Sequence, residues 1–240
     1  MTTDMQVASE GLGLRDLVAQ ETNVDKVRSL LPEHLKGDAQ RLINEALLNI
    51  ATGSKELKEC SPVSIFMCIL QAAKAGLPLD GSLAHAVPYG KQATFIADYK
   101  GMIAVAKRCG LIQDCWAREV RKNDVFFLSE RSGVVEYEFT PSLGADRGEE
   151  WMYFAVATHV DGWRRVEFMT LPELKAIQSR AKSKSGPWST YPEEMRKKTV
   201  IKRLLKTFTD DPVLLSLMKN DADDFTEPRG ATLNEVIGGE

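Results

Sequence analysis

The feature that most constrains the fold is a change of hydrophobic period along the chain. Up to Gly76, apolar residues recur at helical spacing, most clearly from Ala39 to Ile50. Residues 83–169 instead contain short runs rich in β-branched and aromatic residues, separated by Gly-, Asp- and Ser-rich breaks. A helical pattern resumes at Leu171 and continues, with interruptions, to about Asn220. Helices, then antiparallel strands, then helices predict an α+β fold.

Local signals place individual elements within this order. Ser61, Pro62 and Gly76 supply the cap, first residue and stop of a helix. Two apolar runs around Gly90-Lys91 predict a β-hairpin, and residues 98–110 form the next expected helix. A tight turn is expected at Asp161-Gly162. The strands are expected at 113–121, 124–128, 134–139, 151–160 and 164–169.

Length and composition set the boundaries of the folded part. The 240 residues suit one large domain with appendages, which we place at 14–219. Residues 1–13 are expected to be a flexible N-terminus, and 220–240 a disordered acidic tail with few apolar anchors. The polar, acidic start and the lack of an apolar run of ~18 residues predict a cytoplasmic protein that does not contact a membrane.

The chain lacks the usual sequence patterns of catalysis. It has no G-x-x-x-x-G-K-[ST] stretch, no G-x-S-x-G elbow and no H-E-x-x-H motif. The three histidines are isolated, and the four cysteines form no C-x-x-C pair, so we expect reduced, mostly buried thiols. We therefore expect no enzyme activity, no catalytic residues, no metal ligands and no cofactor; ATP is not expected to bind, and Mg²⁺ would serve only as a counterion.

Charge is distributed very unevenly. Between Leu174 and Phe208 ten basic residues face only Glu193 and Glu194, a local balance of +8 in a chain whose net charge is −3. From Thr209 to the end, eight acidic residues face two basic ones, a balance of −6. The overall charge therefore hides a basic segment that is followed by an acidic tail.

The segment "SGPWSTYPEEMRKKTVIKRLLK", residues 185–206, predicts an amphipathic helix with a capping box at Thr190 and Glu193. Its apolar face is expected to contain Ile201, Leu204, Leu205 and Phe208, and the opposite face Arg196, Thr199, Lys202, Arg203 and Lys206. Those cations could bind successive phosphates along a nucleic-acid strand. Trp188 and Tyr191 could stack on bases, although Trp188 could equally belong to the core, and a charged helix face can also be merely solvated.

A second, smaller cluster lies on the helix expected at 98–110. Tyr99 and Lys100 precede Lys107 and Arg108, and Lys100 and Lys107 share a face because they are seven residues apart.

Together these residues resemble the RecT family of phage and prophage single-strand annealing proteins. The resemblance is carried by "GLPLDGSLAHAVPYGKQATFIADYKGMIAVAKRCG", residues 76–110, and by the block from Gly186 to Thr199, and it extends over roughly residues 14–210. Asp98 stands where a small residue would be expected, and the short acidic tail departs from partner-binding C-termini in the family.

The resemblance implies a RecT-like fold and ATP-independent binding and annealing of single-stranded DNA in phage-type recombination. It also implies homo-oligomeric rings or helical filaments, an annealed duplex intermediate, and a phage exonuclease and host single-strand-binding protein as partners. The DNA-binding residues expected on this basis are Tyr99, Lys100, Lys107, Arg108, Arg180, Lys182, Lys184, Trp188, Arg196, Lys198, Lys202 and Arg203. Three alternatives stay open: a passive single-strand-binding protein, a metal-dependent nuclease, and a scaffold whose basic face binds acidic proteins.

Overall fold

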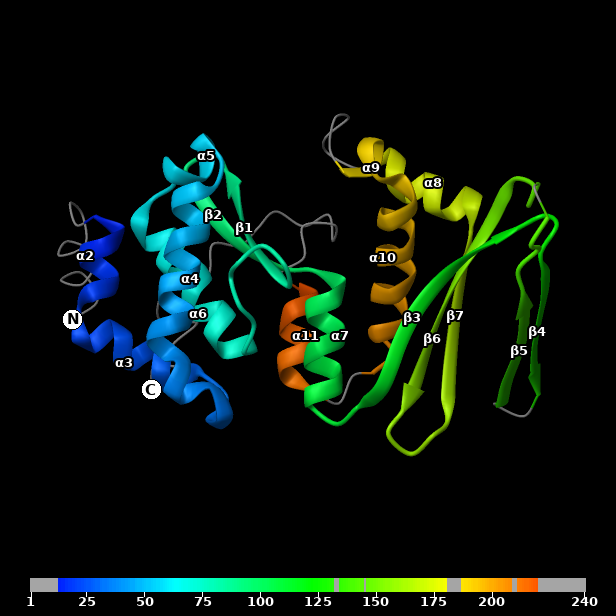
Figure 1. Cartoon of the computed structure of the whole chain (residues 1–240), viewed down its shortest axis with the longest axis horizontal. Helices are drawn as coiled ribbons and strands as arrows, with labels where there is room; N and C mark the ends of the chain where they lie inside the picture. Colours follow the sequence, from blue (N-terminus) through cyan, green and yellow to red (C-terminus); the bar gives the residue numbers. More distant parts are fainter. Residues whose placement is uncertain (1–12, 132–133, 145, 181–186, 209–210, 220–240) are drawn as a thin grey trace. The chain divides into compact units, whose positions relative to one another are not determined.

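The computed structural model describes residues 13–131, 134–144, 146–180, 187–208 and 211–219 (Figure 1). It confirms a mixed fold of helices and antiparallel strands. The contacts divide the chain into two compact units, residues 1–105 with 212–240 and residues 106–211, so the predicted 14–219 domain contains parts of both. Of the N-terminus expected to be flexible, residues 1–13, only Gly13 lies within the described residues, and the acidic tail 220–240 lies outside them.

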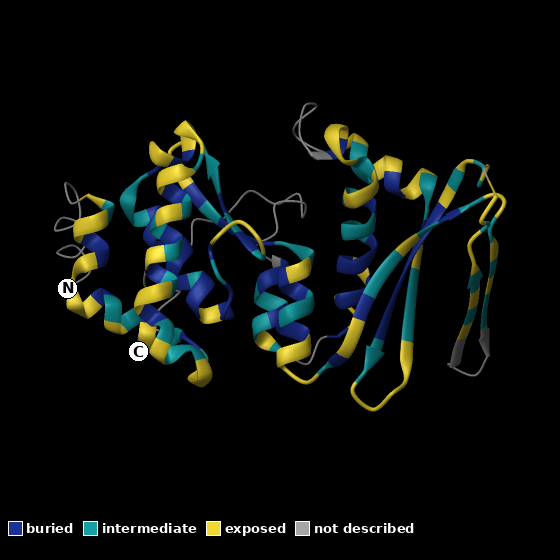
Figure 2. Cartoon of the chain, viewed as in Figure 1, coloured by how far each residue is buried: buried dark blue, intermediate teal, exposed yellow. Residues whose placement is uncertain are grey.

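The first unit is built around a buried helix, α6 (Pro62–Ala75). The predicted signals are confirmed: the Ser61 side chain accepts a hydrogen bond from the Ser64 amide, and Gly76 ends the helix at φ 58°. Ten of the fourteen helix residues are buried, which makes α6 the centre of this unit's core (Figure 2). Around it the structure places α2 (Leu14–Ala19), α3 (Glu21–Leu30), the 3₁₀ helix η1 (Glu33–Asp38), α4 (Ala39–Thr52), α5 (Lys55–Lys58) and α11 (Pro212–Lys219).

The predicted hairpin is also present, as β1 (Ala84–Tyr89) and β2 (Gln92–Ala97), with Gly90 in the turn at φ 60°. The Ala93 amide donates to the Ser64 hydroxyl at 2.9 Å, which ties the hairpin to α6. After β2 the chain enters α7 (Tyr99–Arg108), and the boundary between the two units falls inside this helix.

The start of α7 passes very close to the segment before β1. The Asp98 amide donates to the Leu83 carbonyl oxygen at 2.8 Å, and a Cβ atom built on Gly101 would lie 2.3 Å from that same oxygen. Glycine is therefore required in the Tyr99-Lys100-Gly101 triplet because any side chain would push the helix away from the backbone.

The second unit contains a three-stranded antiparallel sheet in the order β3-β6-β7. Its strands are β3 (Ile112–Arg121), β6 (Glu150–His159) and β7 (Arg164–Thr170), and Gly162 forms the β6–β7 turn at φ 88°. A separate hairpin of β4 (Val125–Arg131) and β5 (Val134–Thr140) completes the predicted strands.

The two faces of this sheet are covered by different elements (Figure 1). The hairpin covers one face: Phe126, Tyr137 and Phe139 pack around the fully buried Phe154. The helix α10 (Pro192–Leu205) covers the other, where the buried Ala155 and Ala157 leave room for a helix to approach. The remaining helices are α8 (Leu171–Ser179) and α9 (Pro187–Thr190).

The capping box predicted at Thr190 and Glu193 is wrong. The residue that precedes α10 is Tyr191, which makes no side-chain capping hydrogen bond. Glu193 lies instead near Arg121 on β3, with its Oε1 atom 3.6 Å from Arg121 Nη2. The Thr–Glu pairing occurs at α8, where the Thr170 amide donates to the Glu173 carboxylate at 2.8 Å.

We expect Gly101→Ala to lower the free energy of unfolding by at least about 2 kcal/mol, because the added methyl group meets a backbone oxygen that has little room to move. Urea unfolding followed by circular dichroism measures this. Gly37→Ala is the matched control, because no atom lies within 4 Å of its Cβ position, and a change within about 0.5 kcal/mol is expected. Equal effects of the two substitutions would contradict the close approach.

Candidate nucleic-acid interface

The apolar face of the basic helix is as predicted. Ile201, Leu204 and Leu205 are buried in α10, and Phe208 is buried just beyond its end. Val200 is also fully buried and widens the apolar face. Most of the stability that this helix gains comes from that packing, since the intrinsic propensity of one short helix is weak.

The charged face differs from the prediction at two positions. Arg196 and Lys202 are each only 7% exposed, so the expected row of four exposed cations is wrong there. With 3.6 residues per turn, Arg196 lies at one edge of the apolar face, next to Val200 in the following turn. Lys202 lies at the other edge, next to Leu205. Arg203 and Lys206 are exposed between these two flanks, as expected.

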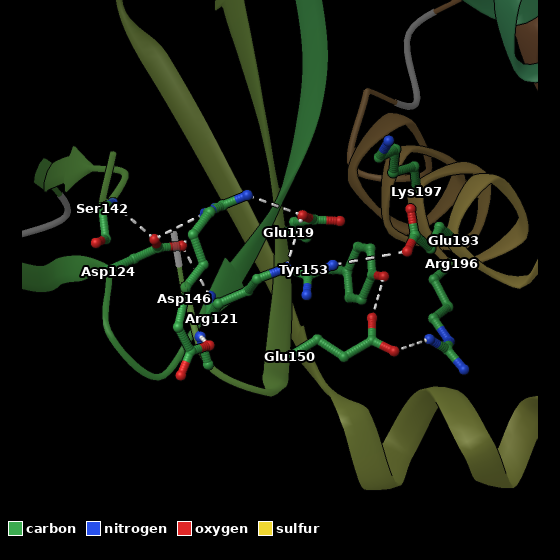
Figure 3. A network of polar contacts seen from close by, with 12 residues as sticks. Glu119, Arg121, Asp124, Ser142, Asp146, Glu150, Tyr153, Glu193, Arg196 and Lys197 are labelled. Carbon is green, nitrogen blue, oxygen red and sulfur yellow. Dashed lines mark hydrogen bonds and ion pairs between the residues drawn. The ribbon is translucent and has the colours of Figure 1, made fainter. Parts of the chain in front are cut away.

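Arg196 is held by two residues of β6. Its Nη1 atom donates to Glu150, and the Tyr153 hydroxyl donates to the same carboxylate (Figure 3). Burial alone would raise the pKa of Glu150, but the hydrogen bonds from Tyr153 and Arg196 outweigh it and hold the pKa below its ordinary value. An ion pair between Arg196 and Glu150 therefore holds α10 against the sheet.

A second charged network lies beside it on β3 (Figure 3). Glu119 accepts hydrogen bonds from Arg121 at 2.9 Å and from Arg147 at 3.0 Å. Arg147 also binds Asp124 through two nitrogens, at 2.6 and 3.1 Å. The backbone amides of Arg121 and Ser142 complete the set of donors to Asp124. This network joins the start of β4 to the loop that precedes β6.

Arg203 and Lys197 of α10 also meet carboxylates. Arg203 Nε lies 3.0 Å from Glu167 on β7, and its Nη1 lies 3.8 Å from Glu173 on α8. Lys197 pairs with Glu194 at 2.9 Å within the helix. Half of the Arg203 side chain remains exposed, so this ion pair stays accessible to another anion.

Trp188 lies in the core rather than on the surface. It is 6% exposed, and its carbonyl oxygen accepts a hydrogen bond from Gln178. Of the two interpretations left open for this residue, the geometry matches core packing, and its ring has no open face for a base. Tyr191, three residues later, is well exposed.

The other predicted residues are placed as follows. In α7, Tyr99 is half-buried, while Lys100, Lys107 and Arg108 are exposed, and Lys107 pairs with Asp114 at 2.8 Å. Arg180 is exposed at the end of α8. Lys198 is half-buried in α10, and Lys182 and Lys184 lie outside the described residues.

Sequence reasoning did not identify an aromatic and cationic cluster at the β6–β7 turn. The ring of Trp163 stacks on His159 and runs parallel to Phe208, and the Arg165 guanidinium lies over Trp163 and Phe208. The signal was present in the run Asp161-Gly162-Trp163-Arg164-Arg165, which combines a turn, an aromatic ring and two cations.

Comparison with known proteins adds the decisive observation. A sequence model of the RecT family matches residues 40–232, a range that contains both α7 and α10. The chain belongs to the RecT family. It is 32% identical to Protein RecT of Escherichia coli K12 over 223 residues, which cover 88% of this chain and 80% of that protein. It is 21% identical to the uncharacterized protein YqaK of Bacillus subtilis 168 over 204 residues, covering 84% of this chain and 69% of the relative.

Two further observations concern other kinds of site. None of the helices in the described residues is both long and apolar enough to cross a bilayer. The four cysteines are unpaired; Cys60, Cys68 and Cys115 are buried as predicted, whereas Cys109 is exposed.

The Asp124 network makes stability depend on pH. Burial works against the Asp124 carboxylate, but Arg147 and the two backbone amides outweigh it and lower its pKa from 3.8 to about 2. A group whose pKa is lowered by folding stabilises the protein above the unfolded value and loses that contribution as pH falls through the folded value.

We therefore expect the wild-type free energy of unfolding to fall between about pH 4 and pH 2 more steeply than that of Asp124→Asn, which has no titrating group at this position. The difference between the two curves isolates Asp124 from the other carboxylates that titrate in this range. Urea unfolding at a series of pH values measures both, and parallel curves would contradict the assignment.

Proposed function

We propose that this protein binds single-stranded DNA and anneals complementary strands in recombination, without ATP and as an oligomer. The observation that carries the proposal is the RecT family match over residues 40–232. The exposed cations in this range supply the electrostatic part of the argument; on α7, α8 and α10 and at their ends they are Lys100, Lys107, Arg108, Lys175, Arg180, Arg203 and Lys206.

The mechanism requires no catalytic step. Phosphates of the first strand bind the exposed cations, and counterions leave the strand. At Lys107 and Arg203 the phosphate replaces a carboxylate, because these side chains pair with Asp114 and Glu167. Arg203 is open to this exchange, because half of its side chain stays exposed beside Glu167 and Glu173. The carboxylates therefore preorganise the cation and lower its entropy cost on binding.

The buried charges have a different role in this proposal. Arg196 is occupied by Glu150 and Tyr153 and is nearly inaccessible, so we assign it to positioning α10 rather than to contact with phosphate. The bases of the bound strand stay accessible to a second strand, and the protein offsets the repulsion between the two phosphate chains. Several subunits aligned on one strand multiply weak contacts through effective concentration.

The proposed partners follow from this activity. They are single-stranded DNA, the annealed duplex intermediate and further copies of the chain, with an exonuclease as the source of single strands and a single-strand-binding protein as their competitor. Magnesium would act only as a counterion to the strands.

Annealing of complementary oligonucleotides labelled with a fluorophore and a quencher tests the proposal. We expect the protein to accelerate annealing equally with and without ATP, more than linearly with protein concentration, and less at higher salt. The salt dependence follows from counterion release. A strict ATP requirement would contradict the mechanism.

The same assay separates the alternatives. Tight binding without faster annealing would favour a passive single-strand-binding protein. Loss of full-length strand on incubation with Mg²⁺ or Mn²⁺ would favour a nuclease. A rate linear in protein, with a monomer bound to DNA in light scattering, would contradict assembly.

A matched pair of variants tests the role of Arg203. We expect Arg203→Gln to weaken single-strand binding several-fold and to reduce the slope of log K against log salt by ~0.7, the value for one lost phosphate contact. Arg28→Gln is the control, because Arg28 is equally exposed and also pairs with a carboxylate, Asp25, but lies in α3. Fluorescence anisotropy across a salt series measures both. Identical slopes for the two variants would remove Arg203 from the interface.

A further inference from the structure

The β6–β7 turn of the second unit presents a tryptophan in an unusual setting. The Trp163 ring lies 4.4 Å from His159, centroid to centroid, at 13°, and 5.9 Å from Phe208 at 7°. Three planar rings are therefore nearly parallel. Despite these contacts Trp163 keeps 43% of its surface exposed.

The cluster is fixed to the end of α10. Arg165 Nη1 donates to the Thr207 carbonyl oxygen at 2.8 Å, and its guanidinium carbon lies 5.3 Å from the Trp163 ring centroid and 5.4 Å from that of Phe208. Thr207 and Phe208 directly follow Lys206, and Arg203 lies one turn earlier. Hence the exposed cations of α10 and the Trp163 ring belong to adjoining parts of one surface.

Charge at this end of the sheet favours an anionic ligand. Arg164 and Lys206 are exposed and Arg165 is half-buried, whereas Asp161, whose backbone amide donates a hydrogen bond to His159 Nδ1, is the acidic residue of the turn. An exposed indole beside several cations combines a surface for stacking with neutralisation of phosphate, which is the combination that binds single-stranded nucleic acid.

Packing alone accounts poorly for Trp163. Trp188, in the same unit, is buried, so the fold has room for an indole in its core. At the turn, a smaller apolar residue would cover Phe208 without leaving a large aromatic surface in water. The exposed ring is better explained by a ligand with a planar face.

We propose that Trp163 is a base-stacking residue of the interface, with Arg164 and Lys206 contacting the adjacent phosphates. This assignment rests on the proposed function and deepens it. The stacking surface is then at the β6–β7 turn and the start of β7, and not at the buried Trp188. The bound DNA strand would run from the exposed face of α10 to this turn.

Binding of fluorescein-labelled oligo-dT to three variants tests the assignment. We expect Trp163→Ala to weaken binding at least tenfold, equivalent to about 1.4 kcal/mol, and Trp163→Phe to stay within about threefold of wild type. The salt slope of Trp163→Ala should equal that of wild type, because a base contact releases no counterion. Trp151→Ala is the control, since Trp151 is similarly exposed, at 39%, but lies at the other end of β6, and no change is expected.

Intrinsic fluorescence supplies a readout that does not depend on the alanine variant folding. Stacking on a base quenches indole emission, so oligo-dT should quench wild type and Trp151→Phe more strongly than Trp163→Phe. Equal quenching in all three, or unchanged affinity of a folded Trp163→Ala, would overturn the assignment while leaving single-strand binding intact. Absence of any single-strand binding by wild type would overturn the proposed function and this assignment together.

Discussion

The arrangement of the second unit depends on one partly buried ionic contact, between the buried Arg196 of α10 and the half-buried Glu150 of β6, supported by the Tyr153 hydroxyl. A pair that is largely removed from water contributes little net stability, but removing Glu150 would leave the buried guanidinium uncompensated and is destabilising. The contact therefore mainly fixes the position of α10 on the sheet. Apolar packing against the small side chains of Ala155 and Ala157 would allow the helix to shift along its axis, whereas the Arg196 guanidinium can reach Glu150 in only one position. The positions of Arg203, Lys206 and Phe208 follow from that register.

The local net charge counted along the sequence differs from the charge that the folded surface presents, and the reason is physical. The basic segment has a local balance of +8, yet two of its arginines, Arg196 and Arg203, meet carboxylates from β6, β7 and the start of α8. Glu150 and Glu167 are far away in sequence, so no count within a window includes them. In the proposed function, a phosphate that binds Arg203 must first displace Glu167 and Glu173. This exchange of anions costs affinity, but in the free protein the carboxylates reduce the repulsion between the cations of α10.

The sequence predicted the elements of the fold well because their signals are local. The Ser61 cap, the Gly76 stop and the Gly90 and Gly162 turns are set by neighbouring backbone, and the strands were placed within a few residues. The burial of Arg196, Lys202 and Trp188 could not be predicted in the same way, because it depends on which surface packs against each one. The spacing of Thr190 and Glu193 fits a capping box, but in the structure Glu193 lies near Arg121 of β3 instead of capping the helix.

Trp188, which is among the predicted DNA-binding residues but is buried, shows how dependence on tertiary packing limits the prediction of an interface. Trp188 and Trp163 both lie near basic residues in sequence, and spacing gives no reason to separate them. The difference is topological: Trp188 belongs to a short helix packed against α10, while Trp163 lies beyond a tight turn at the open end of two strands. A turn at the end of a sheet has few neighbours to cover it, so its side chains stay accessible. An aromatic residue that remains exposed there, with its ring held parallel to two others, is already oriented for a planar ligand and loses little freedom when one binds.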